Sequence, residues 1–126
     1  MCGIVGMAGN NLTHTERKAF KEMLHLDILR GKDGTGVAVI NTRGNWDVVK
    51  RKGTAWDLFE TKPFDEVMRY QEYAYIGHNR AATKGKVTNI NAHPFEFEDV
   101  VGVHNGTIRG QHRLIDNAQF EVDSEN

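Results

Sequence analysis

The single cysteine of this 126-residue chain lies at position 2, directly after Met1. A thiolate is a strong nucleophile, but at neutral pH a thiol needs a nearby base or a lowered pKa to form one. An α-amino group titrates at about 7.7 to 8.0, so a Cys2 freed of Met1 would carry its own base. With Met1 attached, the Cys2 nitrogen is an amide and accepts no proton. The nucleophile hypothesis therefore requires Met1 to be removed, and an ordinary buried thiol is the alternative.

Attack on a carbonyl also needs hydrogen-bond donors for the oxyanion. Asn105 and Gly106 supply a side-chain amide and an unhindered backbone N–H, just past the apolar residues 100–103. An Asn-Gly pair is also the commonest hairpin turn, so a turn is the alternative interpretation.

A polar stretch at residues 78–85 carries a candidate substrate-binding side chain, Arg80, with Asn79 and Thr83 beside it. The planar guanidinium group of arginine matches a carboxylate, so this stretch suits a free amino acid. The alternative is a structural or surface ion pair. The histidines show no metal-ligand spacing and the glycines form no phosphate-binding motif, so we predict neither a metal nor a cofactor.

Composition excludes several classes of function. The 16 basic and 17 acidic residues nearly cancel, which argues against nucleic acid and anionic membrane surfaces as partners. No stretch approaches the roughly 18 apolar residues of a membrane span, and the N-terminus lacks a secretory pattern. One cysteine makes no internal disulfide. We therefore expect one domain, residues 1–126, in a reducing cytoplasm.

The elements that must position these residues alternate between strands and helices. Residues 3–8 read as a short buried strand, and residues 13–28 as an amphipathic helix capped by Thr13 or Thr15 and ended by Gly31. A glycine-rich loop at 30–36 precedes a hairpin of residues 37–40 and 46–50. Two short helical pieces are expected on either side of Pro63. A strand at 73–77 then delivers residues 78–85 into a loop, residues 95–103 form another strand pair, and residues 111–120 suit a helix.

Four separated motifs resemble those of the class II glutamine amidotransferases, whose glutaminase domains are N-terminal nucleophile hydrolases. They are MCGIVG at residues 1–6, RGKDGTG at 30–36, GHNRAATKG at 77–85, and HPF at 93–95 followed by HNG at 104–106. The resemblance implies an α+β fold, an α/β/β/α sandwich of mostly antiparallel sheets. It also implies that the chain is the C-terminally short glutaminase domain of such an enzyme, with that sandwich only partly complete.

The resemblance further implies a role for each site residue. Cys2 would attack the side-chain amide of L-glutamine, and Asn105 with Gly106 would form the oxyanion hole. Arg80 would hold the α-carboxylate of glutamine in a loop that also contains Thr83. Asp123, in the VDSE stretch at 122–125, would hold the α-amino group. The ammonia would pass to a synthase domain or partner subunit.

Two positions depart from the family pattern. Ala81 replaces an aromatic residue that many members carry, and Lys84 replaces a histidine, so the walls of the glutamine pocket differ. Two further hypotheses stay open: a non-catalytic remnant that binds glutamine or docks on a partner, and a hydrolase of the same superfamily that acts on another amide.

Overall fold

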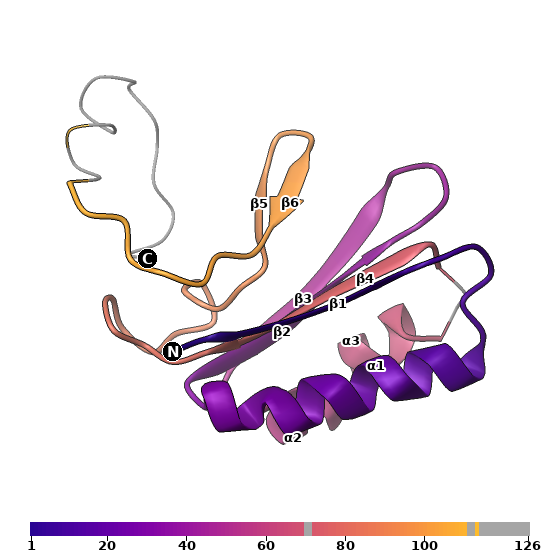
Figure 1. The fold of residues 1–126 in the computed structure, drawn as a ribbon, viewed down its shortest axis with the longest axis horizontal. Helices are drawn as coiled ribbons and strands as arrows, with labels where there is room; N and C mark the ends of the chain where they lie inside the picture. Colours follow the sequence, from indigo (N-terminus) through magenta and orange to yellow (C-terminus); the bar gives the residue numbers. More distant parts are fainter. Residues whose placement is uncertain (70–71, 111–112, 114–126) are drawn as a thin grey trace.

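The computed structural model describes residues 1–69, 72–110 and 113, and it is built on a four-stranded antiparallel sheet (Figure 1). The strand order is β1-β4-β2-β3, and β5 and β6 form a second, two-stranded sheet. The elements in chain order are β1 Gly3–Ala8, α1 His14–Leu26, a 3-10 helix at Asp27–Arg30, β2 Gly34–Ile40, β3 Trp46–Lys52, α2 Ala55–Phe59, α3 Lys62–Val67, β4 Ala74–Arg80, β5 Phe95–Phe97 and β6 Val100–Gly102. The α+β class with mostly antiparallel strands is confirmed, whereas the four-layer sandwich stays a prediction.

Helix α1 begins where the sequence predicts. The Thr13 backbone N–H donates to the Glu16 carboxylate at 2.8 Å, which is half of a capping box. These hydrogen bonds, chiefly the one from the Thr13 side chain, lower the pKa of Glu16. The apolar face of the helix buries Phe20 and Leu24 against the sheet. Each such side chain contributes about 2 to 3 kcal/mol when it leaves water.

The main core lies between the helices and one face of the sheet. Helices α1, α2 and α3 all lie on this face, whereas the β5–β6 hairpin rises from the opposite side (Figure 1). Alternate residues of the strands point into the core, as the period of two requires. The fully or nearly fully buried members include Phe20, Leu24, Val37, Val39, Leu58, Phe64 and Tyr75. This layer covers one face of the sheet, and Cys2 lies at one end of the same sheet.

Two short helices are present as predicted, but the break between them lies at residues 60–61 and Pro63 is inside α3 rather than between the helices. Thr61 caps α3 by accepting a hydrogen bond from the Phe64 N–H at 3.4 Å, and Pro63 lies in the first turn of that helix. Proline is tolerated there because the first N–H groups of a helix have no partner within it.

The central strand β4 is longer than predicted. We expected the strand to end at Gly77 and Arg80 to lie in a loop, but β4 extends through Arg80. It pairs on both sides, with Asn79 opposite Gly3 of β1 and opposite Thr35 of β2. Strand β2 likewise begins at Gly34, within the expected loop. Backbone pairing to two neighbours therefore overrides the polar character of residues 78–80.

Two expectations concern residues that are not described. The predicted helix at 111–120 lies outside the described residues except for Arg113, and Asp123 lies outside them as well. Among the described residues, no helix combines the length and the apolar character needed to cross a membrane.

Candidate active site

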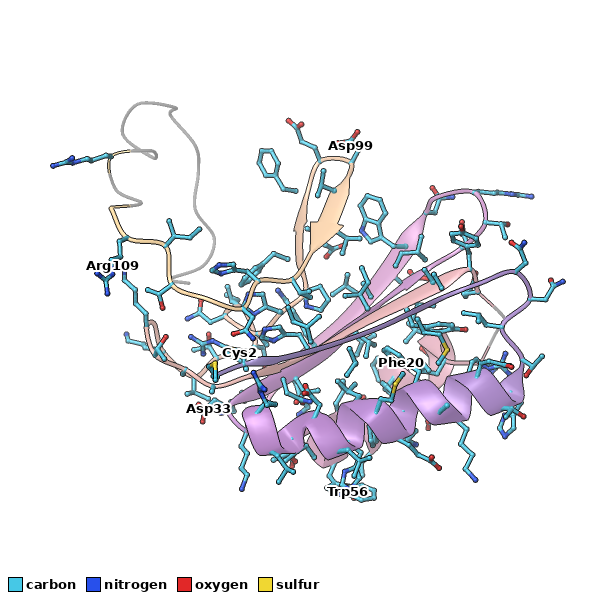
Figure 2. The ribbon with its side chains drawn as sticks, viewed as in Figure 1. Cys2, Phe20, Asp33, Trp56, Asp99 and Arg109 are labelled. Atoms are coloured by element: carbon cyan, nitrogen blue, oxygen red, sulfur yellow. The ribbon has the colours of Figure 1, made fainter. Side chains whose placement is uncertain are left out.

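The Cys2 side chain lies at one end of the sheet, beside the end of β4. Because Gly3 pairs with Asn79, the antiparallel register brings Cys2 to the level of Arg80, one residue before Ala81, the first residue after the strand. The Cys2 sulfur accepts a hydrogen bond from the Ala81 N–H at 3.3 Å and lies 3.6 Å from the Ala81 carbonyl oxygen. Figure 2 shows Cys2 at this end of the molecule. The backbone therefore supplies a donor where a thiolate would carry its charge.

Two glycines allow the backbone to come this close. A Cβ atom on Gly3 would lie 1.8 Å from the Asp27 carboxylate, and one on Gly31 would lie 2.4 Å from the Arg80 carbonyl carbon. At Gly31 the space is filled by backbone atoms, which exclude a side chain, whereas at Gly3 the Asp27 carboxylate would have to move. Gly3 and Gly31, which belong to the first two motifs, therefore allow close packing of the chain around Cys2.

Asp33, in the glycine-rich loop, is hydrogen-bonded to two other segments of the chain. Asp33 accepts a hydrogen bond from the Ala82 N–H at 2.7 Å, and its own N–H donates to the Arg80 carbonyl at 2.9 Å. Its carbonyl accepts from the Gly53 N–H at 3.0 Å. Asp33 therefore fixes the turn that follows β4, which is the turn against which the Cys2 sulfur lies.

A buried polar network lies beneath this turn. Asn79 is fully buried and donates to the Leu24 carbonyl at 2.8 Å and to the Asp27 carboxylate at 3.1 Å. The hydroxyl of Thr35 donates to the Asn79 side-chain oxygen at 2.8 Å. Paired polar groups of this kind specify one arrangement of the chain. Helix α1 and two strands are joined here, directly behind Gly3.

Arg80 is a buried residue at the end of β4, not an exposed one. Its side chain is 2% exposed, and its guanidinium group donates to the Lys84 carbonyl at 2.6 Å and to the Lys86 carbonyl at 3.0 Å. These contacts fold residues 84–86 back onto the strand end. The surface ion pair that we had kept as an alternative is wrong for this residue.

A small cavity of about 30 Å³ brings most of the predicted site residues together. Its lining includes Cys2, Arg80, Thr83 and Gly106. Asn105 lies beside it and donates its side-chain amide to the Cys2 carbonyl at 2.7 Å. Residues more than 100 positions apart therefore meet at one point. Thr83 lies across from Thr107, with 3.4 Å between their hydroxyl oxygens.

Two buried histidines that our sequence reasoning left without a role lie next to this cavity. The rings of His78 and His93 stack with centroids 4.0 Å apart, and His78 Nε2 lies 3.1 Å from the His104 carbonyl oxygen. Burial lowers the pKa of His78 to about 4 and that of His93 to about 3. Both rings are therefore neutral at pH 7. The motifs GHNRAATKG and HPF contained the signal, since each places a histidine beside a strand.

The described residues contain no group of three or more His, Cys, Asp or Glu side chains arranged to hold a metal ion. The groups around the cavity are instead a thiol, a guanidinium group, an ammonium group, backbone N–H groups, hydroxyls and imidazoles. These groups suit nucleophilic attack on a carbonyl and recognition of a carboxylate.

The chain is similar to several curated enzymes that carry the same name, glutamine–fructose-6-phosphate aminotransferase (isomerizing). The protein from Idiomarina loihiensis is 36% identical to this chain, and the alignment covers 96% of this chain and 19% of that relative. The proteins from Sulfurisphaera tokodaii and Francisella tularensis are 35% and 34% identical over 90% and 86% of this chain. No protein-family model matches the chain.

The similarity extends over nearly all of this chain but over a minor part of each relative. The chain spans about a fifth of the length of the curated relatives that it matches, 19% for the first two. It is therefore similar to one region of larger enzymes.

Proposed function

We propose that residues 1–126 belong to a glutaminase domain that hydrolyses L-glutamine to glutamate and ammonia, with Cys2 as the nucleophile. The observation that carries the proposal is the meeting of Cys2, Arg80 and Gly106 around one cavity, with Asn105 bonded to the Cys2 backbone. The relatives are named as aminotransferases of glutamine, which agrees with a reaction at the glutamine side-chain nitrogen.

The reaction begins with the Cys2 sulfur attacking the side-chain carbonyl carbon of glutamine. The resulting oxyanion accepts hydrogen bonds from Asn105 and the Gly106 N–H, each worth about 3 to 4 kcal/mol of barrier. The Cys2 amine, which has taken the thiol proton, delivers a proton to the leaving nitrogen, and ammonia departs. Water then attacks the thioester, and glutamate and the free thiol are released. Arg80 and Thr83 hold the α-carboxylate end of the substrate, and Asp123 holds the α-amine.

Two local changes must precede this reaction. Met1 must be removed so that Cys2 carries an amine, and Met1 is 83% exposed, so its loss removes no core packing. The cavity must also widen, because about 30 Å³ is far below the volume of roughly 300 Å³ or more that ligand sites usually have. We infer that the ammonia is passed on to a synthase domain or partner subunit, since the relatives are named for amino transfer between glutamine and fructose 6-phosphate.

A second candidate function is a glutamine-binding or partner-docking remnant that performs no chemistry. The small cavity favours it, and so does Asn105, whose amide donates to the Cys2 carbonyl rather than toward the cavity. In this case Arg80 would still bind a carboxylate, but ammonia would not form.

Ammonia release from L-glutamine tests the proposal, with the N-terminal mass determined on the same sample. We expect turnover by protein that lacks Met1 and none by Cys2→Ala. A glutamine analogue without the α-amine should react far more slowly, and L-asparagine should not react. Equal turnover by wild type and Cys2→Ala would exclude Cys2 as the nucleophile, whereas glutamine binding without ammonia release would favour the remnant.

A further inference from the structure

The stacked pair His78 and His93 has no part in the proposed reaction, yet it lies directly behind the segment that carries the oxyanion donors. We propose that His78 is a positioning residue, whose Nε2–H group holds the His104 carbonyl and thereby fixes Asn105 and Gly106 beside Cys2. This inference rests on the proposed function, because it assigns these two residues an oxyanion to bind.

The direction of the hydrogen bond determines the tautomer of His78. A carbonyl oxygen only accepts, so the nitrogen that lies 3.1 Å from the His104 oxygen must carry the proton. The other nitrogen, Nδ1, is buried and has no hydrogen-bond partner among the described residues. His78 is therefore expected as the neutral Nε2–H tautomer, with Nδ1 unprotonated.

Burial and the stacked ring of His93 hold the His78 ring in this orientation. His78 is fully buried in the central strand β4, and His93, 3% exposed, covers it with an interplanar angle of 33°. Phe95 in turn packs on His93 with ring centroids 4.3 Å apart. Beneath them, Gly36 leaves room for the His93 backbone, because a Cβ atom there would lie 2.1 Å from the His93 carbonyl oxygen. The imidazole ring thus has little freedom to turn away from His104.

Charge around the pair supports the neutral form. Burial disfavours a proton on either ring, and the charge of Arg80 near both rings and of Lys50 near His93 adds to this effect. A neutral imidazole is also the form in which Nε2 donates a hydrogen bond while Nδ1 is unprotonated. The hydrogen bond to His104 is therefore retained throughout the neutral pH range.

The oxyanion segment is then held on two sides. The His104 carbonyl is bound to His78, and the next residue, Asn105, is bound through its side chain to the Cys2 carbonyl at 2.7 Å. Gly106 packs closely against His104, since a Cβ atom on Gly106 would lie 3.0 Å from His104 Nε2. A misplacement of about 1 Å in a catalytic group can reduce the rate about 100-fold. Loss of the His78 donor should therefore lower kcat more than it changes KM.

Two substitutions at one position separate the donor from the packing. In His78→Phe the ring remains but the donor is lost, whereas in His78→Gln a side-chain amide restores an N–H group near the place of Nε2. We expect His78→Phe to lower kcat about 10- to 100-fold with KM changed less than about 3-fold. We expect His78→Gln to recover most of this loss. His25→Phe is the matched control, because His25 packs against Trp56 in the helical layer and the variant should keep the wild-type kcat.

A measurement without turnover tests the same contact. Nitrogen-15 NMR of histidine-labelled wild-type protein should show His78 as the Nε2–H tautomer, and the Gly106 amide should exchange faster in His78→Phe than in His78→Gln. An Nδ1–H tautomer, an unchanged kcat in His78→Phe, or equal loss in both variants would overturn the proposal. If the wild type hydrolyses no glutamine, the proposed function fails, while the tautomer and the exchange rates still decide whether His78 holds the segment.

Discussion

Arg80 combines a structural contact with a proposed binding role. Its guanidinium group donates to the carbonyls of Lys84 and Lys86 and also lines the cavity that contains Cys2. A lysine has no planar fork with which to make both kinds of contact. The two roles can therefore be separated by measuring substrate affinity and stability on the same variant.

We predict that Arg80→Lys raises KM for glutamine about tenfold or more, because hydrogen bonds to a charged group contribute about 1.5 to 3 kcal/mol. The kcat should fall less, since the α-carboxylate is remote from the reacting carbon. Steady-state kinetics check this expectation, and thermal unfolding reports the loss of the loop contacts. A normal KM in a destabilised protein would mean that Arg80 serves the loop alone.

At the scale of elements, the turn after β4 depends on the close approach of the glycine-rich loop. Gly31 lies against the Arg80 carbonyl carbon and the Ala81 nitrogen, at 2.4 Å and 2.6 Å from its missing Cβ. Both atoms belong to the backbone, so no side-chain rotation can make room.

We predict that Gly31→Ala destabilises the protein by about 1 to 3 kcal/mol, the usual cost of overpacking. It should also reduce glutaminase activity, because the displaced Ala81 is the residue that contacts the Cys2 sulfur. Urea denaturation and the ammonia assay measure the two effects. Gly102→Ala is a matched control in a strand, with open space around the added methyl group, and should change stability by less than about 0.5 kcal/mol. Equal stability of the two variants would contradict the proposed close packing.

The elements that the sequence predicts best are those whose determinants are local. Strand β1 has the predicted bounds, and helix α1 begins at a capping box formed by Thr13 and Glu16, three residues apart. The predicted end of β4 was wrong, because the last residues of this strand are polar and their partners lie far away in the sequence. Asn79, for example, binds Leu24, which lies 55 positions away.

The candidate site shows the same difference between features that local sequence predicts and features that depend on distant contacts. The types of its residues were evident from the motifs, but the contacts of Cys2 with Ala81 and Asn105 span 79 and 103 positions, which no local pattern encodes. The role proposed for His78 depends on the single contact with His104, 26 positions away, which only the folded structure reveals.

At the scale of the whole molecule, the two buried histidines make stability depend on pH. In the unfolded chain each would titrate near 6.5, whereas burial lowers the pKa to about 4 for His78 and about 3 for His93. At pH values between the folded-state and unfolded-state pKa of each histidine, the unfolded state binds more protons than the folded state. Stability is therefore complete above about pH 6.5 and is lost as the pH falls toward 4 and below.

We predict that the free energy of unfolding is level from pH 8 to 7 and falls by on the order of a few kcal/mol from pH 6.5 to 4.5. Hydrogen bonds from Thr13 and Thr54 lower the pKa values of Glu16 and Asp57. These two carboxyl groups change the free energy of unfolding only below about pH 4.5 and 3.8, their ordinary pKa values. The window above pH 4.5 therefore isolates the histidines. Urea titrations at several pH values measure the slope, which should be smaller in His93→Phe. An identical slope in that variant would contradict the assignment.

The most direct test of the central claim is to react the purified protein with a chloromethyl ketone analogue of glutamine and to locate the adduct by mass spectrometry. The proposed mechanism predicts a protein without Met1 that carries one adduct, on the Cys2 sulfur, and excess L-glutamine should slow its formation. Cys2→Ala should carry none. Hydrolysis of glutamine by a protein that retains Met1, or an adduct on another residue with Cys2 unmodified, would contradict the claim that Cys2 is an N-terminal nucleophile.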